Sequence, residues 1–443
     1  MRDSLQHPTR LVPLAFLVAI AIGTALLMLP FARAGDGSAP FLVALFTATS
    51  AACINGLIVV DTPTYWSGFG QGVILILFQV GGFGIMTGAT LLGLLVTRRL
   101  RLATRLMAQT ENRGLVIGDV FGVLRMVLAV TVTVEAIIAA ILTLRLHYFY
   151  GEEWGEALWH GIFQAVSAFN NSGFSSYSDS LVHFALDPLI LVPMMLAILI
   201  GGIGFPVVHD LRRDPLRPSR WTLHSKLTLL GTAFLLPLGF LAFLVYEWNN
   251  AATLGQFGTG GKLLNALFHS ATLRTTGFNT LDVAAMTPSS FVVSYALMMI
   301  GGGSAGTAGG IKVGTFLILG LAVWAEIRGD ADVNAFGRRI SADVLRQAVT
   351  VVLLAIGLVG LAILALLGLS DFSLTFLMFE AISAFSTTGI STGITGQLPP
   401  AAQGIIIGLM FIGRIGTITI ATALALRPRA RAYRYPEERP IVG

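Results

Sequence analysis

Basic residues divide this chain into long apolar stretches, and that pattern constrains its fold more than any other feature. Most of the 28 Lys and Arg residues fall into five tracts. Each interval between neighbouring tracts is long enough to cross a membrane twice, at about 20 residues per crossing. We therefore expect eight membrane spans, with every tract on one side of the bilayer. The tracts are Arg2 and Arg10, Arg98 to Arg125, Arg212 to Lys226, Arg328 to Arg346, and Arg427 to Arg439.

The composition supports a multi-pass membrane protein. Of the 443 residues, 55% are hydrophobic and only 12% are charged, against about 25% charged in soluble domains. A soluble globule of this composition would expose large apolar patches. A single cysteine argues against a disulfide scaffold. The positive-inside rule places the basic tracts, and with them both termini, on the cytoplasmic side, and we expect the chain in the cytoplasmic (inner) membrane. Basic residues on short loops between apolar spans indicate a lipid environment and no nucleic-acid partner.

Every interval also contains a short apolar segment, too short for a full crossing, which we interpret as a re-entrant helix. After each one, Ser-Ala precedes a glycine by six or seven residues, in SAACING, SAFNNSG, SATLRTTG and SAFSTTG. This self-similarity predicts four repeats. The short segments are Phe41 to Ala52, Trp154 to Phe169, Lys262 to Leu273 and Leu374 to Phe385. The expected repeats are 1–110, 111–222, 223–335 and 336–427, followed by a cytoplasmic tail at 428–443.

The four glycine loops are typical of a cation filter. Carbonyl oxygens pointed at a common axis can replace the hydration shell of K⁺. Glycine adopts positive φ and places no side chain in the pore. No Asp or Glu directly precedes any of the four glycines, which favours carbonyl coordination over a divalent-cation site. Close helix packing is the alternative role for these glycines. The expected filter residues are Ile54, Asn55, Gly56, Asn171, Ser172, Gly173, Thr275, Thr276, Gly277, Thr387, Thr388 and Gly389.

A glycine-rich run, GGGSAGTAGGIK at 301–312, interrupts the apolar stretch after the third loop. Glycine at this density cannot sustain a helix, so we expect the span to unwind there. A flexible segment below a filter would act as a gate, and a passive kink is the alternative. The G-x-G-x-x-G match within the run is weak, because no strand–turn–helix surrounds it. The expected gate residues are Gly301, Gly302, Gly303, Ser304, Ala305, Gly306, Thr307, Ala308, Gly309, Gly310 and Lys312.

Several charged residues lie within or beside apolar stretches. Arg414 is deep in the last stretch, where a charge costs about 2.5 kcal/mol or more. We expect Arg414 to face a cavity, with an internal salt bridge as the alternative. Arg274 is expected to hold loop backbone or to pair with Asp282. The sequence leaves the roles of Glu135 and Glu380 open.

These motifs resemble the Trk/Ktr/HKT superfamily of potassium transporters, most closely the KtrB-type membrane subunits. NSGF, RTTGFNTLD and the glycine-rich run carry the resemblance, which covers the whole chain. It implies an all-α polytopic fold of four pseudo-symmetric repeats around one pore. Each repeat has a membrane helix, a re-entrant pore helix, a filter loop and a second membrane helix. Glycine in all four loops implies K⁺ preference, although Asn55 stands where relatives usually have threonine. In this family the arginine corresponding to Arg414 is a barrier to permeation.

The resemblance further implies a homodimer and a cytosolic ring of nucleotide-binding, RCK-type regulatory subunits. K⁺ is the expected transported ion, Na⁺ is left open as an activator, and no organic cofactor is expected. The alternative function is a Na⁺- or H⁺-coupled secondary transporter with alternating access, which predicts inverted halves and broken helices. An enzyme is disfavoured, because no nucleophile–base set or pair of acids occurs within the spans.

Overall fold

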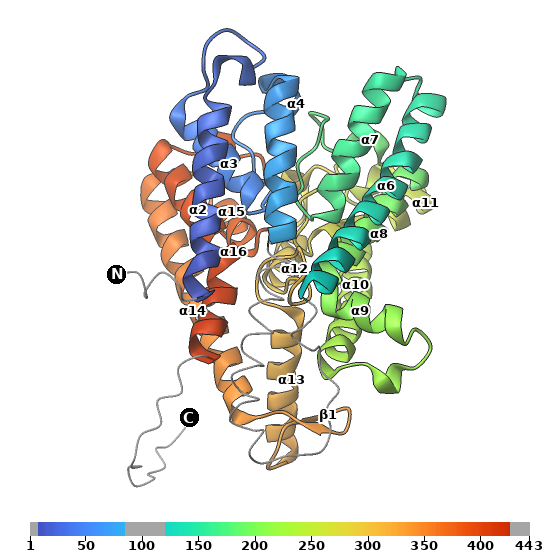
Figure 1. The fold of residues 1–443 in the computed structure, drawn as a ribbon, viewed down its shortest axis with the longest axis vertical. Helices are drawn as coiled ribbons and strands as arrows, with labels where there is room; N and C mark the ends of the chain where they lie inside the picture. The colour runs from blue at the N-terminus through green and yellow to red at the C-terminus, as the bar shows by residue number, and fades with distance from the viewer. Residues whose placement is uncertain (1–7, 85–119, 426–443) are drawn as a thin grey trace.

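The computed structural model describes residues 8–84 and 120–425, and their regular secondary structure is almost entirely helical. A hairpin of two short strands, β1 (Asn334–Ala335) and β2 (Arg338–Arg339), is the exception among them. The predicted repeat boundary at 110/111 and the predicted tail at 428–443 lie outside the described residues. Figure 1 shows the helices gathered side by side, with β1 and the helix before it extending from one end.

The helices recur in groups of three. Each group has a first helix, a short second helix and a third helix, and the short helix packs against the helix before it. The first helices are α2 (Pro8–Leu27), α6 (Val120–Tyr150), α10 (Leu223–Glu247) and α14 (Ala342–Leu369). The short helices are α3 (Phe41–Ala52), α7 (Trp154–Phe169), α11 (Thr259–Thr272) and α15 (Leu374–Ser386). The third helices are Gly68–Gly84, α8 (Pro188–Ile203), α12 (Pro288–Met299) and α16 (Pro400–Ala425).

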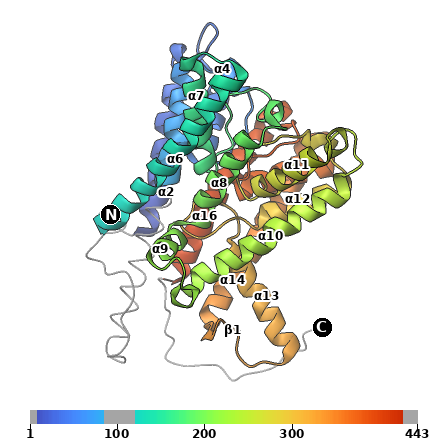
Figure 2. The ribbon, with the colours of Figure 1, turned by 90° about the vertical axis from the view of Figure 1, so that its right-hand side faces the viewer.

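The bounds of the four short helices agree closely with those expected from the sequence. The four short helices begin and end within three residues of their predicted bounds, the largest difference being the start of α11 at Thr259 instead of Lys262. Figure 2 shows α10 and α11 lying side by side.

Shorter elements connect the groups of three helices. They are α4 (Thr62–Tyr65), α9 (Phe205–Arg213), α13 (Val313–Arg328), η1 (Pro30–Ala32), η3 (Val182–Phe184), η4 (Pro218–Arg220), η5 (Leu254–Gln256), η6 (Val283–Ala285) and η7 (Thr395–Gln397).

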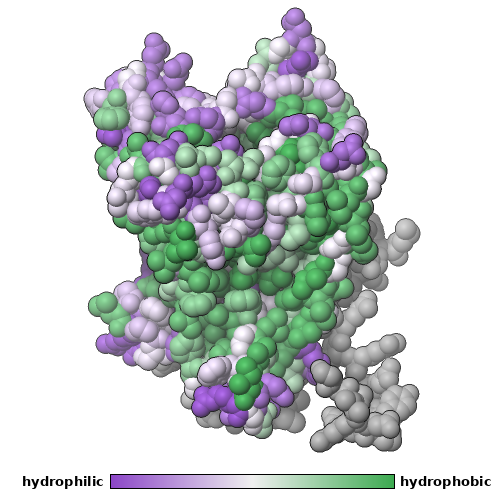
Figure 3. Space-filling model, turned by 180° about the vertical axis from the view of Figure 1, so that it is seen from behind, coloured by the Kyte–Doolittle hydropathy of each residue, from purple (hydrophilic) through white to green (hydrophobic). Residues whose placement is uncertain are grey.

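Three of the described helices are each long and apolar enough to cross a membrane, and they lie within α6, α10 and α14. The bent pair α8–α9 provides a fourth crossing if it is counted as one broken span. The other apolar stretches found among the described residues, such as Val12–Leu27 in α2 and Pro400–Gly416 in α16, have 10–17 residues. Seen from behind, apolar side chains form a broad band between more hydrophilic ends (Figure 3). Many of the exposed large side chains are apolar, as expected for a surface that faces lipid.

Two of the third helices are broken. The break in α12 was predicted: the helix ends at Met299 and resumes as α13 at Val313. The break between α8 and α9 was not predicted, and the chain bends there by 98°. Gly204 lies at this corner with φ +91°, and Pro206 follows in the first turn of α9. Proline has no N–H to continue the α8 ladder, and glycine accepts the left-handed corner.

Aromatic packing joins the first two groups of helices. Phe78, from the helix Gly68–Gly84, meets Phe163 of α7 edge-on at a centroid separation of 5.6 Å. It also stacks on Phe174 at 6.2 Å. All three side chains are buried. Offset and edge-to-face aromatic pairs add about 0.5–1.5 kcal/mol to area burial, so this contact helps to fix the loop that follows α7.

A buried carboxylate fixes the end of α10. Glu247 is 0% exposed, and it accepts hydrogen bonds from the Thr253 hydroxyl at 2.5 Å and the Ser290 hydroxyl at 2.5 Å. The backbone N–H and hydroxyl of Thr287 also donate to it, each at 2.8 Å. Because Thr287 is the N-cap of α12, this carboxylate joins the ends of α10 and α12.

We expect Glu247→Gln to lower the thermal stability of the purified protein. The amide places donors opposite the donors of Thr253, Thr287 or Ser290, and each unsatisfied buried group costs about 1–3 kcal/mol. The measurement is the melting temperature in detergent. The control is Glu156→Gln, at an exposed position in the first turn of α7. Equal melting temperatures for the two variants would contradict the role assigned to Glu247.

Candidate ion pathway

The loops that follow the four short helices share one backbone conformation. In each loop the glycine has positive φ: 93° at Gly56, 71° at Gly173, 98° at Gly277 and 81° at Gly389. The residue two positions earlier is also left-handed, which is uncommon for a residue with a side chain. These residues are Ile54, Asn171, Thr275 and Thr387, with φ between 52° and 71°. Such strain persists where the surroundings over-determine it, typically at functional sites.

The four glycines pack against one another in a closed ring. A Cβ added to Gly56 would lie 2.5 Å from the Ser172 carbonyl oxygen in the second loop. Added to Gly277, it would lie 2.6 Å from the Thr388 carbonyl oxygen in the fourth. A side chain at Gly173 would overlap the Thr276 carbonyl oxygen, and one at Gly389 would overlap that of Asn55. The residues that precede the glycines therefore place four carbonyl oxygens in the ring.

Backbone hydrogen bonds hold each loop to its own short helix. The N–H groups of Asn55, Ser172 and Thr388 donate to the carbonyls of Ser50, Ser167 and Ser383 at 2.8, 2.9 and 2.9 Å. In the third loop, which is one residue longer, Thr276 donates to Thr272 at 3.0 Å. All twelve residues predicted for the filter therefore lie together around the ring. Asn55 additionally donates from its amide to the Ala384 carbonyl at 2.9 Å, at the end of α15.

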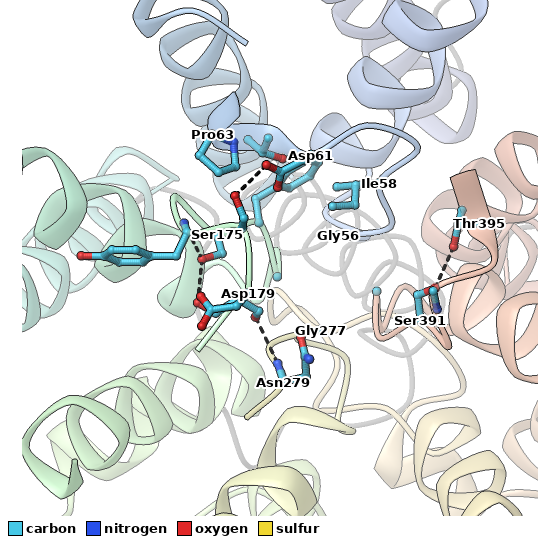
Figure 4. Close-up of a pocket in the computed structure, with 18 of the residues that line it drawn as sticks. Gly56, Ile58, Asp61, Pro63, Ser175, Asp179, Gly277, Asn279, Ser391 and Thr395 are labelled. Carbon is cyan, nitrogen blue, oxygen red and sulfur yellow. Dashed lines mark hydrogen bonds between the residues drawn. The ribbon is translucent and has the colours of Figure 1, made fainter. Parts of the chain in front are cut away.

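A cavity of about 500 Å³ opens on one side of the ring. All four glycines line it, together with the residues that follow them (Figure 4). Asp61 and Asp179 give its wall two carboxylates. Asp61 accepts a hydrogen bond from the Ser178 hydroxyl at 2.7 Å, which connects the first and second loops. A negative wall of this kind attracts cations.

Tyr177 lies in the same wall, in the loop beyond the second glycine. Its hydroxyl donates to Glu152 at 2.7 Å. Burial, and then this hydrogen bond, raise the pKa of the phenol well above its usual range. The phenol therefore stays neutral and adds no charge to the cavity.

The glycine-rich segment 301–312 lies against the other side of the loops. The Thr307 hydroxyl donates to Asn171 Oδ1 at 3.1 Å, and the Gly309 N–H donates to Thr275 Oγ1 at 3.3 Å. A Cβ at Gly309 would overlap the side chain of Thr387. The segment therefore contacts three of the four loops, in each case at the residue with positive φ two positions before the glycine.

The broken end of α8 forms a seat for the same segment. The N–H of Gly303 donates to the Gly202 carbonyl at 2.8 Å, and that of Thr307 to the Gly201 carbonyl at 3.2 Å. In return, Phe205 N–H donates to the Ala305 carbonyl at 3.3 Å. This contact was not predicted from the sequence. The signal was available in the dipeptide Phe205–Pro206, which follows the glycines and favours a helix start.

Two cationic side chains bind the segment's carbonyl oxygens. Arg414 is 2% exposed, and its Nη1 donates to the Thr307 carbonyl. Lys312 Nζ donates to the carbonyls of Ala308 at 2.5 Å and Gly309 at 3.4 Å. No carboxylate within ion-pair distance of Arg414 occurs in the described part of the chain, so the salt-bridge alternative finds no support there.

Other charged residues take positions that the sequence left open or predicted otherwise. Arg274 forms no ion pair with Asp282 among the described residues, and Asp282 instead accepts from the Ala284 N–H at 3.0 Å. Glu135 accepts hydrogen bonds from Gln79 at 3.1 Å and from Asn170 at 3.0 Å, directly before the second filter loop. Glu380 bonds to the loop beyond the fourth glycine.

Gly389→Ala is expected to lower the melting temperature more than Gly393→Ala. Both glycines have positive φ, 81° and 88°, so alanine carries the same backbone strain of about 1–2 kcal/mol at either position. Only at Gly389 would the new Cβ also overlap the Asn55 carbonyl, whereas nothing lies within 4 Å at Gly393. Equal losses of stability would show that the ring is not closely packed.

Comparisons with known proteins agree with this geometry. The family model described as TrkH, "Cation transport protein", matches residues 2–435. The chain is 37% identical to Ktr system potassium uptake protein B of Bacillus subtilis, over 98% of this chain and 97% of that protein. It is 34% identical to the protein of the same name from Vibrio alginolyticus, over 98% and 94%. Potassium/sodium uptake protein NtpJ of Enterococcus hirae is also 34% identical, over 98% and 97%.

A solved structure shares the fold. The crystal structure of the potassium transporter TrkH from Vibrio parahaemolyticus matches with a TM-score of 0.73, covering 96% of this chain and 86% of that one, at 18% identity. At this identity the match establishes the architecture alone, whereas the family model and the closer relatives span nearly all of the sequence. The chain belongs to the TrkH family of cation transport proteins.

Proposed function

We propose that this chain is the ion-translocating subunit of a Ktr-type system for K⁺ uptake across the cytoplasmic membrane. The observation that carries the proposal is the closed ring of four glycines, which brings four backbone carbonyls to one axis. Relatives 34–37% identical over 98% of the chain are named as K⁺ uptake proteins. Entry of K⁺ is driven by the inside-negative potential, worth about 2.3 kcal/mol per charge per 100 mV.

The filter consists of the three residues up to and including each glycine, at 54–56, 171–173, 275–277 and 387–389. K⁺ gathers in the acidic cavity, sheds water at the ring and is coordinated by backbone carbonyls. The short helices contribute the negative ends of their dipoles, because the C-terminal turn of each one leads into a filter loop. The side-chain amide of Asn55 donates to a carbonyl at the end of α15, and its backbone carbonyl is left to face the ring.

The segment 301–312 is the gate, and Arg414 is the barrier beneath the filter. Support comes from the contacts of Thr307 and Gly309 with the underside of the loops. K⁺ can leave toward the cytoplasm only after this segment moves away from its seat on α8. The motion exchanges a small number of hydrogen bonds, each worth about 1 kcal/mol, so the docked and open states can be close in free energy.

The full architecture comprises four repeats, at 1–110, 111–222, 223–335 and 336–427, with eight spans and both termini cytoplasmic. The basic tracts Arg212 to Lys226 and Arg328 to Arg346 both lie in the lower half of Figure 1, in keeping with the positive-inside rule. The expected assembly is a homodimer in the lipid bilayer with a cytosolic ring of nucleotide-binding, RCK-type subunits. The Ktr system named for the relatives supports the presence of such a partner.

The second candidate function is Na⁺- or H⁺-coupled transport by alternating access. The observation in its favour is the printed name of the Enterococcus relative, a potassium/sodium uptake protein. Two broken helices, α8–α9 and α12–α13, are also typical of such transporters. The four-membered ring of carbonyls favours a channel-like pore, with Na⁺ acting at most as an activator.

Gly277→Ser is expected to reduce the preference for K⁺ over Na⁺ by about tenfold, which corresponds to about 1.4 kcal/mol. Gly277 has φ +98°, and a side chain there would meet the Thr388 carbonyl, so the serine distorts the ring. The measurement is ⁸⁶Rb⁺ uptake, with competing K⁺ or Na⁺, in cells without their own K⁺ systems. An unchanged preference would refute the filter, and absence of uptake by the native chain, with or without a regulatory partner, would refute K⁺ transport.

Deleting residues 303–309 is expected to raise K⁺ flux, because this stretch occupies the path below the filter. The matched variant Thr307→Val removes only the hydroxyl that bonds Asn171 and should raise flux by less. Flux is measured in proteoliposomes and normalised to the amount of protein inserted. A well-inserted deletion variant that carries less K⁺ than the native chain would count against the gate.

A further inference from the structure

The four filter loops are alike at the ring but differ in what supports them from behind. Around the ring, the contacts run from the first loop to the second, third and fourth and back to the first. The second and fourth loops therefore face each other across the axis, as do the first and third. Behind the ring, two particular side-chain hydrogen bonds between short helix and loop occur in one facing pair and not in the other.

The first shared support is a polar side chain nine residues before the glycine. In α15 this residue is Glu380, whose carboxylate accepts a hydrogen bond from the hydroxyl of Ser391 at 2.7 Å. In α7 it is Gln164, whose amide donates to the hydroxyl of Ser175 at 2.8 Å. Both serines stand two residues after their glycine and line the cavity above the ring. Glu380 is 0% exposed and Gln164 is 2% exposed.

The second shared support comes from the serine of the Ser-Ala pair. Ser383 donates from its hydroxyl to the Ile390 carbonyl at 2.6 Å, and Ser167 donates to the Phe174 carbonyl, also at 2.6 Å. Both acceptors belong to the residue directly after the glycine. In the second and fourth loops, side chains of the short helix thus hold the two residues beyond the ring.

Neither support occurs in the first and third loops. Phe268 stands nine residues before Gly277, and Ile58 two residues after Gly56, so neither loop can form the first bond. The hydroxyl of Ser50 accepts from the Gly56 N–H at 3.1 Å instead of binding the next carbonyl. The hydroxyl of Ser270 donates away from the loop, to the Leu236 carbonyl of α10 at 2.8 Å.

The support of the fourth loop is the stronger of the two. Besides Ser391, the Glu380 carboxylate accepts the Thr392 N–H at 2.8 Å, the Thr392 hydroxyl at 3.1 Å and the Thr395 hydroxyl at 2.6 Å. No Lys or Arg forms an ion pair with it among the described residues. The partners of this carboxylate are therefore donors of its own loop, and a buried carboxylate of this kind fixes the groups that solvate it.

We propose that the second and fourth loops form a rigid pair that sets the width of the K⁺ site, with Glu380 and Gln164 as its positioning residues. The first and third loops adjust around the ion held by this pair. The inference rests on the proposed filter. Na⁺ is the smaller ion and requires the carbonyls to move inward; bracing two facing loops resists that movement.

The testing variant is Glu380→Gln in the full chain, assayed for inhibition of ⁸⁶Rb⁺ uptake by K⁺ and by Na⁺ in proteoliposomes. Loss of one hydrogen bond of about 1 kcal/mol is expected to shift the ratio of the two inhibition constants toward Na⁺ by about fivefold. Ser391→Ala, which removes one donor and leaves the carboxylate in place, is expected to shift the ratio in the same direction by less.

Glu247→Gln is the matched control, because Glu247 is equally buried and accepts a similar set of hydrogen bonds. It joins α10 to α12 and bonds to no filter loop, so it should lower stability and leave the ion preference unchanged. Thr47→Val probes the corresponding position in α3 and should also leave the preference unchanged, since Ile58 offers no hydroxyl there.

Two results would overturn the proposal: an unchanged ratio in folded Glu380→Gln and Ser391→Ala, or an equal shift in Glu247→Gln. If Glu380→Gln fails to insert into the membrane, Ser391→Ala and Gln164→Leu test the proposal through the same ratio of the K⁺ and Na⁺ inhibition constants. Failure of the filter itself is distinguished by Gly277→Ser. If that variant changes the preference while the Glu380, Ser391 and Gln164 variants do not, the filter stands and the rigid pair is wrong.

Discussion

Four stretches of backbone have to approach a common axis so closely that no side chain fits between them. At Gly56, Gly173, Gly277 and Gly389, a Cβ would come too close to a carbonyl oxygen of the neighbouring loop. Much of the surrounding structure serves this constraint. The short helices end where the loops begin, and backbone bonds such as Asn55 to Ser50 anchor each loop to its helix. The left-handed residues at 54, 171, 275 and 387 carry strain that such anchoring must hold.

The sequence was sufficient for the features that depend on local chemistry. Apolar length separated short helices from long ones, so α3 and α7 were predicted with their observed bounds. Glycine density predicted the break after Met299, because no nearby residue could compensate for the loss of helix propensity. The register of Ser-Ala and glycine located all four loops. It did not reveal that Ser167 and Ser383 hold the carbonyl beyond the glycine, although the repeated serine was the available signal.

Features that depend on contacts between distant segments could not be predicted. Phe205–Pro206 could have located the corner at Gly204, but it could not show which segment packs there, about a hundred residues later in the chain, where Gly303 bonds Gly202. Glu247 is a similar case, since its donors come from the start of α12. A pair between Arg274 and Asp282 was one of two roles expected for Arg274, and Asp282 caps the turn at Ala284 instead. In each case several partners were compatible with the sequence, and packing selected one.

Below the ring, the proposed gate uses the same carbonyl chemistry as the proposed filter, with the protein's own cations as the bound ions. Carbonyl oxygens solvate K⁺ well, and a flexible glycine-rich segment under the filter presents several of them. Here those of Thr307, Ala308 and Gly309 are bound by Arg414 and Lys312, so fixed cations already bind the oxygens that could otherwise solvate a cation. In the proposed gate, the segment opposes passage in two ways, by its volume and by the charges that hold it.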